Sequence, residues 1–274
     1  MSETGVSSIP YTELRQASLA TVRQAIRQGD YTSHTAGLGV GQLQANLAIM
    51  PERFALDFMR FCQRNPKPCP LVGVTDTGNP MMTTVGEIDI RTDVPSYNVY
   101  RHGELDSQVS DLIEYWQDDF VAFALGCSYT FEAALIAAGI RMAHIEQDLT
   151  VPMYKTSLQT VPAGPFGGGM VVSMRAINND QLQSVVDICK GYPHAHGAPV
   201  HIGDPAEIGI TQLAKPDWGD PPVIGRDQTT VFWACGVTPQ NAIAQAGLPL
   251  FISHTPGRML ITDVPELAEV PVLA

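Results

Sequence analysis

Two cysteines occupy equivalent positions in two similar stretches of the chain. Each stretch has an apolar run, then a cysteine, then a threonine, and later a glycine. These residues are Cys127, Thr130 and Gly139 in the first stretch, and Cys235, Thr238 and Gly247 in the second. The pattern twice predicts a buried strand and a short helix, with the threonine hydroxyl capping the helix and the glycine ending it. The alternative is a chance likeness between two strand–helix units.

In a true duplication, each thiol lies at the carboxyl end of a strand and faces a helix N-terminus. Free backbone N–H groups and the positive end of the helix dipole favour anions at that point. This setting lowers the pKa of a thiol and raises its reactivity. The other interpretation of Cys127 and Cys235 is that they only fill space, as most buried cysteines do.

A glycine-rich loop and an arginine follow the first of these stretches. Gly167 and Gly168 let backbone N–H groups approach a carboxylate, a phosphate or a developing oxyanion closely. The loop matches neither a Walker motif nor a dinucleotide fingerprint, and the alternative is a merely flexible loop. Arg175, at the end of the next apolar run, has the planar fork that suits a substrate carboxylate. The alternative interpretation of Arg175 is that it forms a surface ion pair.

Three histidines and an aspartate are concentrated in residues 194–205. Histidine titrates near neutrality, so His196 or His201 could move a proton, with Asp204 orienting the ring or acting as a base. His194 and His196, on an extended segment, would share one face. The same side chains could bind a divalent cation, although their spacing matches no specific metal signature. Satisfied structural histidines are the third interpretation.

Composition limits the class of protein. The chain has 274 residues, of which 45% are hydrophobic, enough for a substantial core. Only 16% are charged, against roughly 25% in an average domain, which predicts a buried interface and a homo-oligomer. The net charge is −12 with no run of basic residues, which argues against nucleic acid and anionic membranes as partners.

Composition and segment pattern also predict a soluble cytoplasmic protein. The sequence has no signal-peptide pattern at its start and no apolar stretch of the roughly 20 residues needed to span a bilayer. Its five cysteines show no C-x-x-C spacing, which suits a reducing compartment better than a disulfide framework or a zinc site.

Several long motifs lie between about Tyr31 and Asp263. They are residues 31–38, 44–47, 57–70, 89–95, 163–168, 171–175, 196–205 and 232–240. Together they resemble the D-glutamate cyclase family, whose bacterial members include proteins called hydro-lyases. Departures from the family pattern are Ala176, where a proline is usual, and residues 40–42, which lack a proline and an aromatic residue.

The resemblance implies a lyase that adds or removes water, with a small carboxylate metabolite as substrate and a divalent metal such as Mn²⁺ as a candidate cofactor. Distant members interconvert D-glutamate and 5-oxo-D-proline. The expected fold is α/β: a three-layer α/β/α-like main domain containing the duplicated strand–helix unit, and a smaller two-layer α/β domain. The expected main domain comprises residues 1–70, 113–148 and 200–274, and the smaller one residues 71–112 and 149–199.

These inferences combine into one hypothesis, in which distant residues converge on a single cleft. The expected catalytic residues are His201, His196, Asp204 and Cys235. The expected substrate-binding residues are Arg175, Arg91, Gly167, Gly168, Ser173, Cys127 and Thr238. Lactam formation needs a base and a nest for the tetrahedral oxyanion, whereas a simple dehydratase must remove an α proton and protonate a hydroxyl. The rival hypothesis is a non-catalytic protein that binds small acidic metabolites with the same nest and arginines.

Overall fold

The computed structural model describes residues 8–147 and 149–268, which form two compact units. Unit 1 comprises Met1–Leu56, Val72–Leu125 and Gly247–Ala274, and unit 2 comprises Asp57–Leu71 and Gly126–Ala246. Helix α3 (Glu52–Arg64) begins in unit 1 and ends in unit 2. None of the described helices combines the length and the apolar character that crossing a lipid bilayer requires.

Strand pairing explains why this division differs from the expected one. Residues 72–112 belong with residues 1–56, because β3 and β4 join the sheet of β1 through β10. Residues 149–199 belong with residues 200–246, because β7 pairs with the whole of β9. Backbone hydrogen bonds between strands that are distant in sequence thus decide which segments belong to each unit.

Unit 1 is built on a seven-stranded sheet with the order β2-β5-β1-β10-β3-β4, in which β11 also pairs with β1. Its strands are β1 (Gln42–Pro51), β2 (Leu71–Val74), β3 (Tyr97–Arg101), β4 (Glu104–Val109), β5 (Phe120–Gly126), β10 (Phe251–His254) and β11 (Leu260–Pro265). Nearly every residue of β1 and all of β5 are buried, as expected for central strands. A short 3₁₀ turn (Thr83–Val85) packs on the same core.

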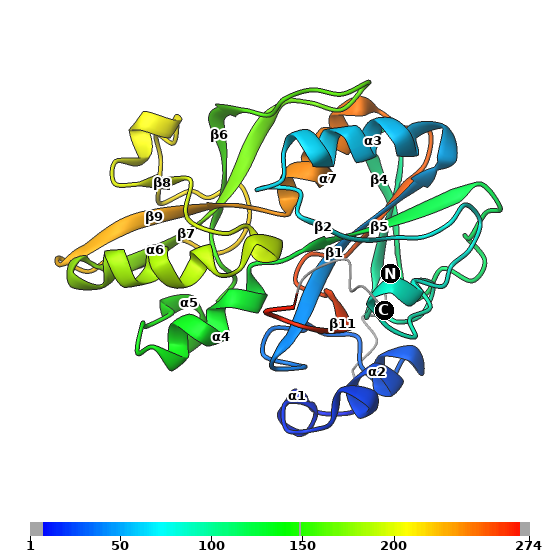
Figure 1. The fold of residues 1–274 in the computed structure, drawn as a ribbon, viewed down its shortest axis with the longest axis horizontal. Helices are drawn as coiled ribbons and strands as arrows, with labels where there is room; N and C mark the ends of the chain where they lie inside the picture. Colours follow the sequence, from blue (N-terminus) through cyan, green and yellow to red (C-terminus); the bar gives the residue numbers. More distant parts are fainter. Residues whose placement is uncertain (1–7, 148, 269–274) are drawn as a thin grey trace. The chain divides into compact units, whose positions relative to one another are not determined.

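Two short helices, α1 (Tyr11–Leu14) and α2 (Leu19–Arg27), cover part of unit 1 beside β11 (Figure 1). Ser18 caps α2 by accepting a hydrogen bond from the Thr21 N–H at 3.2 Å. The apolar face of α2 buries Val22, Ala25 and Ile26 in a small cluster with Ile261 of β11.

Unit 2 is built on a four-stranded antiparallel sheet with the order β6-β7-β9-β8. Its strands are β6 (Met153–Gln159), β7 (Gly169–Asn178), β8 (His201–Ile202) and β9 (Gln228–Ala234). Its helices are α4 (Tyr129–Ala137), α5 (Ala143–Glu146), α6 (Leu182–Lys190) and α7 (Val237–Ala246), with 3₁₀ turns at Asn179–Gln181, Pro193–Ala195 and Pro205–Ile208.

The two faces of this sheet carry different residues. Ser173 pairs with Trp233 and Arg175 with Val231, so these side chains share the face on which α4 and α6 pack (Figure 1). Met174 pairs with Phe232, and their side chains share the opposite face with residues of the 205–213 segment. Side-chain alternation along β7 therefore decides which residues can meet.

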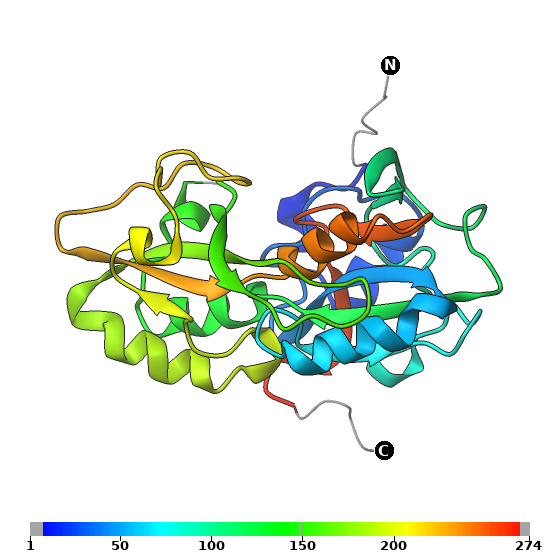
Figure 2. The same cartoon turned by 90° about the horizontal axis from the view of Figure 1, so that it is seen from above.

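The duplicated strand–helix pattern is confirmed, and so is the α/β class. β5 leads through Cys127 into α4, and β9 leads through Cys235 into α7, as Figures 1 and 2 show for the second copy. Gly139 and Gly247 follow the two helices with φ of 78° and 61°, the left-handed conformation that favours glycine.

The predicted threonine cap is wrong for Thr238. Its hydroxyl accepts a hydrogen bond from the Val171 N–H at 3.0 Å and donates one to the Val171 carbonyl at 3.1 Å. It joins the start of α7 to β7 instead of capping the helix, because β7 offers a backbone donor and acceptor within reach of the buried hydroxyl.

Candidate functional site

The two thiols have matching environments in unit 2. The Cys127 sulfur accepts a hydrogen bond from the backbone N–H of Tyr129. The Cys235 sulfur accepts hydrogen bonds from the N–H groups of Val237 and Gly236. In both copies the second residue after the cysteine is therefore a donor, which places each sulfur against the first turn of its helix.

Burial decides the protonation of these thiols. It raises the pKa of Cys127 to about 12, although the Tyr129 N–H and the charge of Arg175 act to lower it. It also raises the pKa of Cys235, against the lowering effects of the Val237 N–H and Arg175. Both groups are thus neutral thiols at neutral pH. The expectation of a lowered pKa at a helix N-terminus is wrong here, because desolvation outweighs the helix.

A buried ion pair lies beside the thiols. The Arg175 Nε donates to Glu132 Oε1 at 3.0 Å, and Nη2 donates to the same oxygen. Nη1 donates to the Ser173 hydroxyl at 3.0 Å and Nη2 to the Ser128 hydroxyl at 3.1 Å. The guanidinium also lies 5.1 and 5.2 Å from the ring centroids of Phe131 and Trp233. Only 4% of Arg175 is exposed, so it is no surface ion pair.

Glu132 holds this arginine in place from α4. Burial acts to raise its pKa, but Arg175 and the hydrogen bond from His144 outweigh that effect and bring it to about 2. The His144 Nε2 lies 3.1 Å from Glu132 Oε1. Glu132 already occupies the guanidinium of Arg175, so Arg175 acts on the two thiols through its charge. Its Nη1 also orients the Ser173 hydroxyl. Glu132 was missed in the sequence analysis. It is the single acid inside the apolar helix α4, and an ionised carboxylate buried there requires a cation beside it.

His196 belongs to the same unit but is not on an extended segment. It follows the 3₁₀ turn Pro193–Ala195 with φ of 75°, so the expected shared face of His194 and His196 is wrong. Its Nδ1 donates to the Lys67 carbonyl at 2.7 Å, which leaves Nε2 without a proton in the neutral ring. Burial, together with the charge of Arg175, lowers the pKa of His196 to about 4. His196 is therefore a neutral imidazole.

His201 and Asp204 do not join the cysteine cluster. His201 pairs with Phe232, so its ring lies on the face opposite to Arg175. Its Nε2 donates to the Asp204 backbone carbonyl at 2.8 Å. The Asp204 carboxylate instead accepts from the Ala206 N–H at 2.9 Å and caps the turn that begins at Pro205. The expected convergence fails because the two groups of residues lie on opposite faces of one sheet.

The glycine loop connects β6 and β7 and lies at the far end of α7. The Gly168 carbonyl accepts from the Thr160 N–H at 2.9 Å and from the Thr160 hydroxyl at 2.7 Å. A Cβ on Gly168 would lie 2.4 Å from Oε1 of Gln245, and its φ is 114°. Gln245 follows Val237, the first residue of α7, by eight residues, so about 12 Å of helix lies between them. A role of Gly167 and Gly168 in binding an oxyanion stays a prediction.

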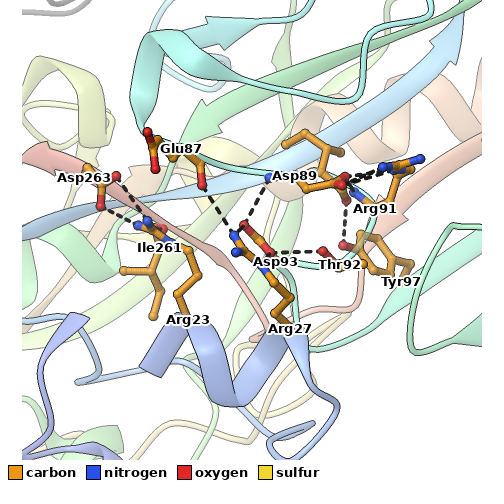
Figure 3. Close-up of polar contacts among 11 residues, drawn as sticks. Arg23, Arg27, Glu87, Asp89, Arg91, Thr92, Asp93, Tyr97, Ile261 and Asp263 are labelled. Carbon is orange, nitrogen blue, oxygen red and sulfur yellow. Dashed lines mark hydrogen bonds and ion pairs between the residues drawn. The ribbon is translucent and has the colours of Figure 1, made fainter. Parts of the chain in front are cut away.

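Arg91 belongs to unit 1, in a network of acids and arginines shown in Figure 3. Its Nη2 donates to Asp89 Oδ2 at 2.7 Å and its Nε to Asp89 Oδ1 at 3.0 Å. Arg27 is bound in the same way by Asp93, a carboxylate whose side chain is fully buried. This network holds α2 against the loop before β3, and Arg91 already has a carboxylate partner.

The described residues bring together no group of three or more His, Cys, Asp or Glu side chains that could hold a metal ion. The candidate donors explain this: His196 is buried against a carbonyl, and Asp204 caps a turn. The expected donors therefore do not gather around one point among the described residues, and a divalent cofactor such as Mn²⁺ stays a prediction.

Several similar proteins align with most of the chain. A "Putative hydro-lyase" of Dinoroseobacter shibae is 65% identical over 96% of this chain and 88% of its own length. A protein of the same name from Ruegeria pomeroyi is 62% identical over 97% of both chains. A third, from Jannaschia sp., is 54% identical over 93% of this chain and 97% of its own. An α/β protein with these relatives is of the lyase type.

The family model for D-glutamate cyclase matches residues 121–263. The chain belongs to the D-glutamate cyclase family, and the resemblance drawn from its motifs is confirmed. A solved nitrogen repressor-like protein from Methanococcus jannaschii aligns over 84% of this chain and 90% of its own with a TM-score of 0.38 and 8% identity.

Proposed function

We propose that this protein is a hydro-lyase that acts on a small carboxylate metabolite and interconverts D-glutamate and 5-oxo-D-proline. The observation that carries the proposal is the matched pair of neutral thiols, each bonded to the first turn of a helix in unit 2. A neutral thiol can donate a proton, and the N–H groups that face its sulfur stabilise the thiolate that remains.

The reaction requires proton transfer and no redox chemistry. A C–N bond forms between the α-amine and the γ-carboxyl carbon, and one C–O bond of that carboxyl breaks. The ammonium group loses two protons and the departing oxygen gains two, leaving as water. Protein groups therefore act only as relays, and a thiol that protonates the departing oxygen regains a proton from the amine.

Cys235 is the proposed proton donor, because its side chain is partly exposed whereas Cys127 is buried. Two N–H groups, from Gly236 and Val237, face its sulfur, against one at Cys127. Arg175 supports the thiolate through its charge and is a positioning residue, since Glu132 already occupies its fork. Cys127 serves in the proposal as the second thiol that lines the site.

The test is direct incubation of the purified protein with D-glutamate or with 5-oxo-D-proline, followed by NMR. L-Glutamate is the matched substrate control, and each reaction is run with and without Mn²⁺. Cys235→Ala should reduce the rate by about 100-fold or more, the usual contribution of a general acid. Cys62→Ala removes another buried thiol of unit 2 and should leave the rate unchanged.

Unchanged substrate in every arm would discard the cyclase reaction. Binding of acidic metabolites without turnover would then favour the metabolite-binding protein. Full activity of Cys235→Ala would remove this thiol from the mechanism and leave the reaction itself intact.

A further inference from the structure

Arg258 of unit 1 is held by a tight turn between β10 and β11. The turn runs over Thr255–Arg258, and the Arg258 N–H donates to the Thr255 carbonyl at 2.9 Å. Pro256 and then Gly257, with φ of 81°, occupy the central positions, as a type II turn requires. The turn fixes the backbone from which the guanidinium projects.

Two other segments hold this turn rigidly. The Thr255 N–H donates to the Ser96 carbonyl at 2.9 Å, and the Thr35 N–H donates to the Gly257 carbonyl at 2.9 Å. The Met259 N–H donates in turn to the Thr35 hydroxyl at 2.9 Å. Thr35 lies in the motif at residues 31–38, which the proposed thiol chemistry does not use.

A chain of hydroxyl groups orients the guanidinium. Arg258 Nη1 donates to the Ser96 hydroxyl at 2.7 Å. The Ser96 and Thr255 hydroxyl oxygens lie 2.6 Å apart, and the Thr255 hydroxyl donates to Asn98 Oδ1 at 3.1 Å. Because the Thr255 proton is used there, Ser96 must be the donor to Thr255. The direction of every hydrogen bond from the guanidinium to Asn98 is thus fixed.

Arg258 differs from three other arginines of unit 1 because it has no acidic partner in the described part of the chain. Arg23, Arg27 and Arg91 of unit 1 each bind an aspartate (Figure 3). Among residues 8–147 and 149–268, no carboxylate forms an ion pair with Arg258. Burial lowers its pKa more than the nearby Tyr31 raises it, so this charge is partly desolvated with no ion-paired carboxylate beside it. That is unusual in a chain with 28 acidic residues and a net charge of −12.

The outer edge of the guanidinium is open. Only Nη1 of Arg258 has a hydrogen-bond partner among the described residues. Nε and Nη2 have no hydrogen-bond partner among the described residues and are not fully buried, so they reach solvent. These two N–H groups form the planar fork that binds a carboxylate in bidentate fashion.

We infer that Arg258 is a binding site for the carboxylate of a small organic acid. The geometry supplies an anchored cation, a preorganised neutral hydroxyl chain behind it and a free fork in front. The choice of D-glutamate and 5-oxo-D-proline as ligands rests on the proposed function. Arg175 and Arg91, the arginines expected to bind a carboxylate, are both occupied by acids.

Residue-resolved labelling with phenylglyoxal, which adds to the two terminal nitrogens of an accessible guanidinium, tests this on the wild-type protein. Mass spectrometry measures the labelling rate of Arg258 in the protein without additives. The measurement is repeated with 5-oxo-D-proline, D-glutamate, inorganic phosphate or pyrrolidin-2-one present. Pyrrolidin-2-one is the matched control, since it is the same lactam ring without the carboxylate. Arg258 should label faster than Arg27 and Arg91, and the two carboxylates should protect it while pyrrolidin-2-one does not.

Binding measurements on variants supply the second arm. Arg258→Gln should weaken the binding of 5-oxo-D-proline about 10- to 100-fold, the range for a hydrogen-bonded charged group. Arg258→Lys keeps the charge but lacks the fork, and should bind with intermediate affinity. Arg101→Gln removes an arginine of the same unit that pairs with Asp106 on the surface, and should bind as the wild type does.

Equal labelling of Arg258 with and without carboxylates would overturn the inference. Equal protection by pyrrolidin-2-one, or protection by phosphate alone, would overturn it too. The labelling experiment is repeated on Cys235→Ala, which removes the proposed proton donor. In Cys235→Ala, protection should persist although turnover is lost. In the wild-type protein, protection without turnover would sink the proposed reaction and support the carboxylate site, whereas turnover without protection would do the reverse.

Discussion

Replacing Glu132 by glutamine should destabilise the protein strongly, and the size of the loss can be estimated from the structure. The ordinary pKa of a glutamate is 4.5, and that of Glu132 is about 2, since Arg175 and His144 outweigh the effect of burial. One pKa unit corresponds to about 1.4 kcal/mol, so the ionised carboxylate contributes about 3 kcal/mol at neutral pH. Breaking a buried pair from one side costs a similar amount, about 3–5 kcal/mol, because Arg175 is left uncompensated.

The pH dependence has a definite sign. The pKa of Glu132 is lowered on folding, so its contribution is complete above about 4.5 and is lost as the pH falls toward about 2. Urea denaturation followed by tryptophan fluorescence should therefore show the full gap between wild type and Glu132→Gln at pH 7. The gap should be smaller at pH 3. Glu146→Gln is the matched control, because that glutamate pairs with Arg141 on the surface, and no measurable change is expected.

A double variant separates charge from packing. Glu132→Leu combined with Arg175→Met should recover most of the stability, since no buried charge is left without a partner. Equal stability of wild type and Glu132→Gln at pH 7 would refute the reasoning. So would a gap that stays constant down to pH 2.

Three further predictions concern stability, each measured by denaturation. Thr238→Val should cost about 1–3 kcal/mol, because the buried Val171 N–H loses the hydroxyl that it donates to and the Val171 carbonyl keeps only the Cys235 N–H, and Thr238→Ser should restore most of it. Asp204→Ala should cost about 1 kcal/mol through loss of a turn cap while the reaction rate is unchanged; a large drop in rate would instead return Asp204 to the mechanism. Gly126→Ala should prevent stable folding, because its Cβ would lie 1.6 Å from the backbone oxygen of His194, and a soluble, cooperatively unfolding variant would contradict this.

The local pattern of the sequence was enough to predict the two strand–helix units. An apolar run, a cysteine and a glycine that needs positive φ depend on neighbours within about twenty residues, so they can be read without knowing the fold. Cys127 and Cys235 were found in this way, and the matching N–H donors at Tyr129 and Val237 follow from the same periodicity. The motifs were also long enough to identify the family.

The sequence alone could not decide which side chains meet. Arg175 and Met174 are adjacent, yet they lie on opposite faces of β7, and the pairing register with β9 and β8 places His201 with Met174. Register is set by hydrogen bonds between strands far apart in the chain, so a histidine-rich segment can look catalytic and still lie on the other face.

The partners of charged groups were likewise decided only by the tertiary structure. Whether an arginine is free to bind a ligand depends on the acids that folding brings to it, and those acids come from distant segments. Glu132 and Asp89 occupy Arg175 and Arg91, whereas Arg258, which no motif singled out, keeps an open fork. Residue type and spacing therefore determined the thiol-bearing units and the family, while long-range pairing determined which of the described arginines are bound by an acid.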